Sequence, residues 1–129
     1  MESDLIWETI RKREQELCDL EDDYYQEKNK LASRQDDIEQ RQNALRLLIE
    51  REQEEMRYFL SRHSLDFDAV SPYFQELEQL QEDSSYQYRR EMDQLFQQEE
   101  QLTHQYRTNL YHLEDTISQL RKEYANGPE

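Results

Sequence analysis

Histidines and carboxylates are the residues of this chain whose types and spacing first suggest chemistry. Glu100 and His104 lie one helical turn apart. A di-iron site in a helical bundle instead needs Glu and His at a step of three residues, and no such pair occurs. The other acids are numerous, and pairs such as Asp22 and Asp23 are typical of a solvated helix face. We therefore expect no catalytic, cofactor-binding or metal-binding residues, and a protein that is not an enzyme.

The charge balance is strongly acidic. The 129 residues include 31 Asp and Glu against 16 Lys and Arg, which gives a net charge of −15. Lys and Arg are absent between Arg62 and Arg89. Proteins that hold phosphates present a basic stripe, so this balance disfavours nucleic acids and anionic membrane surfaces as partners.

Targeting signals are also missing from the sequence pattern. No apolar run approaches the roughly 18 residues that span a bilayer, and the acidic start MESDLIWETI does not resemble a cleavable signal peptide. We expect no membrane insertion and residence in the cytoplasm, with export by a route that needs no cleavable signal left open. Cys18 is the single cysteine, so no internal disulfide framework forms, and we expect it to be a small packing residue.

The chain contains one convincing helix break. The whole chain has one Gly and two Pro. Ser71 suits a helix N-cap, and Pro72 suits the first helical position. The residue before a proline avoids the α region, so a helix that runs through Ser71 is not expected. At the other end, Asn126, Gly127 and Pro128 are predicted to stop the second helix.

These signals predict an all-α fold with a single domain over residues 1–129. We expect a long antiparallel two-helix hairpin, similar to a coiled coil, with arms over about 4–62 and 72–124 and a turn over about 63–71. The turn should place Phe59 and Leu60 near the start of the second arm, and Ile10 near Leu120 and Tyr124.

Apolar residues mark the seam of each arm. In the first arm one position recurs every seven residues, with Leu20 and Leu48 expected at the second seam position. The heptad residues are Ile10, Leu17, Tyr24, Leu31, Ile38 and Leu45. In the second arm steps of three and four follow one another with two polar interruptions, and extra steps of four act as stutters. These residues are Tyr73, Leu77, Leu80, Ser84, Tyr88, Met92, Leu95, Glu99, Leu102, Tyr106, Leu110, Leu113, Ile117, Leu120 and Tyr124.

Two helices of this kind bury only one seam, and a small core gives little net stability. We therefore expect further helices, from a partner or from a second copy, to complete the structure, and a homodimer is one such arrangement. Apolar residues around the turn are expected to close the hairpin end, with a binding patch as the alternative. They are Leu65, Phe67, Val70, Tyr73 and Phe74.

The second arm carries the densest apolar stripe, between Met92 and Tyr124. A helical partner can lay its own apolar face along such a stripe, with aromatic side chains as anchors. We predict Phe96, Tyr106 and Tyr111 as anchors and Leu110 and Leu113 as the floor. Acids at the rim would favour a basic face on the partner; they are Glu99, Glu100, Glu114 and Asp115.

Four segments carry a resemblance to a known family. They are LEDDYYQEKNKL at 20–31, MRYFL at 56–60, YRREMDQLFQQEEQL at 88–102 and NLYHLEDTISQLRKEY at 109–124. In these the chain resembles the small helical accessory proteins encoded beside LXG-type toxins of the type VIIb secretion system. The resemblance implies a non-enzymatic targeting factor or chaperone. Its partners would be the helical N-terminal region of a toxin, a second small helical accessory protein, or both. Unlike small secreted proteins of that system, the chain has no Trp-x-Gly turn.

Export of this type also uses a helical signal of the form aromatic-x-x-x-acid. Tyr111 with Asp115 fits it, and two further pairs also match. About three matches are expected by chance among the 13 Tyr and Phe, so the motif carries no weight of its own. A structural coiled-coil protein, of the export-gate stalk or phage-scaffold type, is the alternative function.

Overall fold

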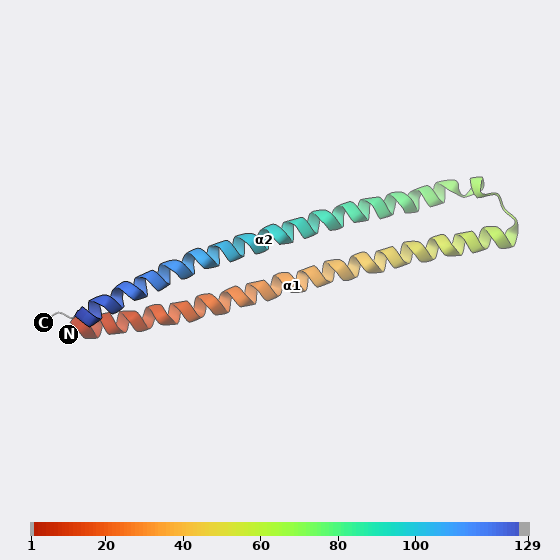
Figure 1. Ribbon diagram of the computed structural model, residues 1–129. Coiled ribbons are helices and arrows are strands. Elements are labelled where there is room, and N and C mark those ends of the chain that lie inside the picture. Colours follow the sequence, from red (N-terminus) through yellow and green to blue (C-terminus); the bar gives the residue numbers. More distant parts are fainter. Residues whose placement is uncertain (1, 127–129) are drawn as a thin grey trace. The chain divides into compact units, whose positions relative to one another are not determined.

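The fold is an all-α helical hairpin, as the sequence predicts. The computed structural model describes residues 2–126 and contains α1 (Glu2–His63), the short 3-10 helix η1 (Phe67–Ala69) and α2 (Ser71–Asn126), with no strand in that range (Figure 1). The helices begin and end within two residues of the expected arms. Gly127 and Pro128, the predicted stop signal, lie outside the described residues.

Helix α1 is continuous because no Gly or Pro interrupts it and its ends match the helix dipole. Glu2 and Asp4 lie in the first turn, and Arg62 and His63 lie in the last turn. Negative charge is favourable near the N-terminal end of a helix and positive charge near the C-terminal end. These placements stabilise both ends of a helix that the seam alone supports weakly.

The end of α1 has the geometry of a Schellman motif. The Leu65 amide donates to the Leu60 carbonyl at 3.2 Å, and Ser64 between them has a φ of 51°. The left-handed conformation at this position is usually taken by glycine, because a side chain makes it unfavourable. The motif also brings an apolar residue after the helix toward its last turn, here Leu65 and Leu60.

Helix α2 begins one residue earlier than predicted. The Val70 carbonyl accepts from the Tyr73 and Phe74 amides at 3.0 and 3.3 Å. Val70 is thus the capping position, Ser71 is the first helical residue and Pro72 is the second. Pro72 is still tolerated there, since the first amides of a helix have no partner within the helix.

The chain consists of two compact units, which we describe separately. The terminal unit combines the chain up to Leu31 with the chain from Gln97 onward, and the turn unit is Ala32–Phe96. Each unit contains a stretch of α1 and a stretch of α2 that run in opposite directions.

In the terminal unit the two stretches are joined by apolar, aromatic and charged contacts. Ile10 and Ile117 are buried. The Arg121 guanidinium donates to the Glu14 carboxylate at 2.6 Å, which is consistent with the register predicted for Ile10 and Leu120. The described residues include no buried polar or charged side chain, so this seam depends on apolar contact with polar groups at its edges.

In the turn unit Ile38, Ile49, Leu60 and Leu95 are buried. Polar side chains add cross-helix links at three levels. Ser84 donates to the Gln42 side chain at 2.8 Å, the Tyr73 hydroxyl donates to Glu52 at 2.7 Å, and Arg41 pairs with Glu91. Hydrogen-bonded polar pairs of this kind disfavour a shift of one helix along the other, since a shift would leave them without partners.

The seam confirms the heptads of the first arm up to Leu45 and corrects the pattern beyond it. All six heptad residues are buried or half-buried. Leu48, which the heptad places in the seam, is instead 50% exposed, and Ile49 is 2% exposed. Ile38, Ile49 and Leu60 are spaced by eleven residues, which corresponds to about 3.67 residues per turn, close to an undistorted helix.

The same spacing of eleven residues describes which residues of α2 lie in the seam. It connects the buried or half-buried residues Tyr73, Ser84, Leu95, Tyr106 and Ile117. Leu80 and Tyr124, which were also expected in the seam, are exposed. A stutter adds a step of four residues to a heptad, and seven plus four makes eleven. The extra steps of four noted in the sequence therefore recur regularly along α2.

Candidate protein-binding surfaces

The α2 surface consists of the residues predicted to bind a partner, which are Phe96, Tyr106, Leu110, Tyr111 and Leu113. Some of its predicted anchors are exposed and one is packed within the hairpin. Phe96, at the end of the turn unit, is 62% exposed, and Tyr111, in the terminal unit, is 69% exposed. Both are therefore available to a partner. A large apolar or aromatic side chain in water is a potential anchor, because burying it removes much area from water at low rotamer cost.

Tyr106 is engaged within the hairpin. Its ring stacks on Tyr24 with a centroid distance of 4.1 Å and an interplanar angle of 9°. Tyr24 in turn shares a hydrogen bond with Thr103 at 3.2 Å between the two hydroxyl oxygens. Loss of hydration in the seam, followed by the charge of nearby Glu21, raises the pKa of the Tyr106 hydroxyl above its ordinary 10.0. The role that the structure gives Tyr106 is packing between α1 and α2.

Leu110 and Leu113, the predicted floor, are half-buried. The stripe on this stretch of α2 is thus covered more fully than the sequence suggested, since Leu102 and Leu120 are also half-buried and Ile117 is buried. The stripe predicted as a partner-binding surface is therefore partly covered within the terminal unit. Tyr124 at the end of the stripe and Tyr111 beside it are exposed.

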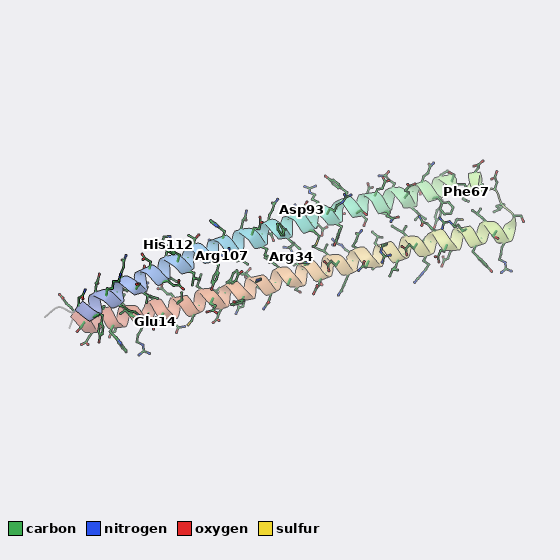
Figure 2. All side chains as sticks on the ribbon, viewed as in Figure 1. Glu14, Arg34, Phe67, Asp93, Arg107 and His112 are labelled. Atoms are coloured by element: carbon green, nitrogen blue, oxygen red, sulfur yellow. The ribbon has the colours of Figure 1, made fainter. Side chains whose placement is uncertain are left out.

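Tyr111 lies among polar neighbours. Its ring packs edge-on against His112 with centroids 6.2 Å apart, and Figure 2 labels His112 on α2. Asp115, one turn further along, accepts a hydrogen bond from Gln119 at 3.3 Å. Tyr111 and Asp115 are both exposed, so both members of the predicted secretion motif are accessible.

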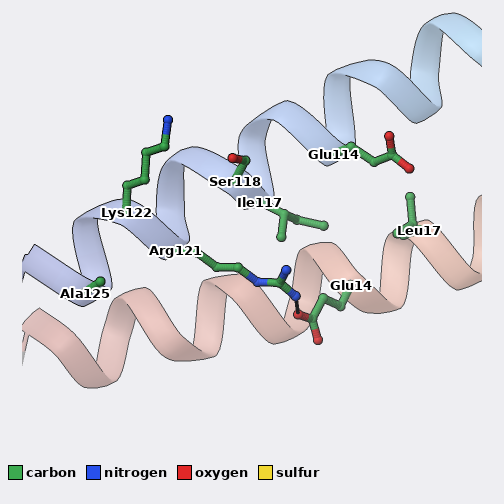
Figure 3. Close-up of a pocket in the computed structure, with 8 residues that line it drawn as sticks. All are labelled: Glu14, Leu17, Glu114, Ile117, Ser118, Arg121, Lys122 and Ala125. Atoms are coloured by element: carbon green, nitrogen blue, oxygen red, sulfur yellow. Dashed lines mark hydrogen bonds and ion pairs between the residues drawn. The ribbon is translucent and has the colours of Figure 1, made fainter.

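The terminal unit also contains a groove that sequence reasoning missed. Its apolar base is Leu17 and Ile117, and the Glu14–Arg121 ion pair crosses it (Figure 3). Its volume is about 530 Å³ and its remaining lining is Glu114, Ser118, Lys122 and Ala125. Two acids and two bases lie along it, so it does not select a ligand by charge. The register predicted for Ile10 and Leu120 was the one signal that could have brought Glu14 and Arg121 together.

Some apolar residues around the turn are half-buried, and others are exposed. Val70, Tyr73 and Phe74 are half-buried, and Arg57 lies over the Phe74 ring at 5.8 Å. Leu65 and Phe67 are exposed. Phe59 is also exposed, and its ring lies tilted against His63 with centroids 4.4 Å apart. Val70, Tyr73 and Phe74 are thus the partly covered apolar residues at this end of the hairpin, while Leu65 and Phe67 of the connection remain accessible.

Three further observations concern metal ligands, the cysteine and membrane-spanning helices. Within residues 2–126 no group of three or more His, Cys, Asp and Glu side chains is arranged to hold a metal ion. Cys18, expected to be a packing residue, is exposed instead. No helix in the described range has the length and apolar character required to cross a bilayer.

No family model, curated protein or solved structure matches this chain.

Proposed function

We propose that the chain is a non-enzymatic adaptor, a targeting factor or chaperone that binds the helical N-terminal region of an LXG-type toxin for type VIIb export. The observation that carries the proposal is the exposure of Phe96 and Tyr111 on α2. Both are aromatic side chains that the hairpin does not use. The segments that resemble the LXG accessory proteins supply the class of partner.

The chemistry of α2 supports a helical protein partner over other ligands. Helical partners bind such surfaces through apolar residues at steps of three and four. The chain's net charge of −15 favours a basic face on the partner and a salt-dependent association rate. A second small helical accessory protein would meet the same requirements.

Co-expression with the neighbouring open reading frames, followed by pull-down, tests the proposal. We expect the full chain to recover a toxin or accessory protein. Phe96→Glu and Tyr111→Glu are each expected to reduce recovery at least about tenfold, because each places a charge where an anchor must be desolvated.

Each variant has a matched control on the same unit. For Phe96 the control is Tyr86→Glu, since Tyr86 is 65% exposed and also lies on α2. For Tyr111 it is Leu5→Glu, since Leu5 is 65% exposed and lies on α1. Wild-type recovery by both Phe96→Glu and Tyr111→Glu, with helicity retained, would exclude this surface.

A structural stalk or scaffold is the second candidate. The lengths of α1 (62 residues) and α2 (56 residues) favour it, because coiled coils are built from long helices with a repeated apolar seam. A stalk predicts recovery of capsid or export-gate components, or of copies of the chain alone, in the same pull-down.

A further inference from the structure

The connection between α1 and α2 presents a second apolar surface, separate from the one on α2. We define the turn surface as Leu65, Asp66, Phe67 and Asp68. Leu65 and Phe67 are both about half exposed. Figure 2 labels Phe67 at this end of the turn unit. Single exposed apolar residues are common, so the case for a site depends on how these two are held and on what surrounds them.

The backbone of the turn surface is fixed by its own hydrogen bonds. The Schellman motif at Ser64 sets the direction of Leu65. The Asp66 carboxylate accepts from the Asp68 amide at 3.3 Å, which caps η1, and the Phe67 ring stacks on Phe74 with centroids 5.3 Å apart. A surface that is already ordered loses little conformational entropy when a partner binds.

Acidic residues predominate in the sequence around this surface. Residues 63–88 include six acids and no Lys or Arg. Two arginines of α1 add positive charge near the turn: Arg57 lies over Phe74, and Arg62 donates to the Tyr58 hydroxyl at 2.8 Å. The six acids outnumber them. The turn surface therefore favours a basic partner. Two copies of it facing each other would oppose acid to acid, which argues against a second copy of this chain.

We propose that the turn surface is a docking site for a basic amphipathic helix of another protein. Leu65 and Phe67 enter the apolar face of that helix, and its Lys and Arg residues face Asp66, Asp68 and the acids at the start of α2. The site does not depend on Phe96 or Tyr111 of α2.

The experiment measures fluorescence anisotropy of a labelled peptide titrated with the full chain. The probe is a designed amphipathic helix of Leu and Lys with about five turns, and its Leu and Glu counterpart is the charge control. Phe67→Ala and Leu65→Ala test the two contacts. Leu47→Ala is the matched control, because Leu47 and Phe67 are each 54% exposed and both lie in the turn unit. None of the three substitutions changes the net charge.

We expect the Lys peptide to bind and the Glu peptide not to bind. Phe67→Ala and Leu65→Ala should each raise the Kd about tenfold, and Leu47→Ala should change it by less than about twofold. Equal effects of all three substitutions would show attraction to the acidic chain as a whole and would overturn the proposal. Sedimentation that shows a dimer of the wild type but a monomer of Phe67→Ala would also overturn it, since the occupant would then be a second copy. Circular dichroism on each variant verifies that helicity is retained.

Discussion

Replacement of Ile49 by alanine should destabilise the turn unit far more than replacement of its neighbour Leu48. Ile49 is 2% exposed and Leu48 is 50% exposed. Truncation of a buried Ile to Ala typically costs about 2–5 kcal/mol. A seam between two helices collapses or hydrates more easily than a thick core, and alanine favours helix by a few tenths of a kcal/mol, so we expect about 2–3 kcal/mol for Ile49→Ala. Leu48→Ala removes side-chain area that is half in water already and should cost less than about 1 kcal/mol.

Urea denaturation followed by circular dichroism measures both values. The two positions are adjacent and belong to the same unit, so any departure from a single unfolding transition affects both variants alike. The measurement is repeated at several protein concentrations, because self-association would add to the apparent stability. A cost for Leu48→Ala equal to or above that for Ile49→Ala would refute the seam with eleven-residue spacing and restore the heptad.

Three further outcomes follow from the described contacts. The hydrogen bond to Glu52, together with desolvation, raises the pKa of Tyr73 above 10.0. The folded state therefore holds this proton more tightly than the unfolded chain does. The wild type should be more stable than Tyr73→Phe below pH about 10, and denaturation at stepped pH should show this advantage decline as the pH rises further. Ser64→Gly should raise the free energy of unfolding by about 0.5–1 kcal/mol, since relief of about 1–2 kcal/mol of left-handed cost outweighs the added entropy of the unfolded chain. The urea midpoint should rise accordingly, and an unchanged midpoint would argue against the positive φ at Ser64. Arg121→Ala should cost less than about 1 kcal/mol because its pair with Glu14 is exposed, and a larger loss in the same assay would mean that the pair contributes more than a surface ion pair does.

The architecture was predictable because its signals are local. A chain with Pro72 as its single internal proline and with apolar residues at steps of seven on one side of it has few alternatives to a hairpin. The heptad from Ile10 to Leu45 located the first half of the seam correctly. It failed at Leu48, because a heptad assigns positions with a period of 3.5, while the helices pack here with a period nearer the natural one of about 3.6.

The surfaces were harder to predict because they depend on contacts across the hairpin. Tyr106 and Tyr111 are both tyrosines in one helical pattern, yet the first is half-buried and stacks on Tyr24, while the second is exposed. The pattern also gave no sign that Ser64 would take the conformation usually occupied by glycine. Propensity favours glycine there, and the hydrogen bonds of the Schellman motif overrode it.

The proposed adaptor function is tested most directly by the Kd of the purified chain for the helical N-terminal region of an LXG-type toxin. The account predicts measurable binding that Tyr111→Glu weakens at least about tenfold, while Leu5→Glu, at a similarly exposed position of the same unit, leaves the Kd within about twofold of wild type. Absence of binding to the toxin region, or equal Kd values for the wild type and both variants, would contradict it.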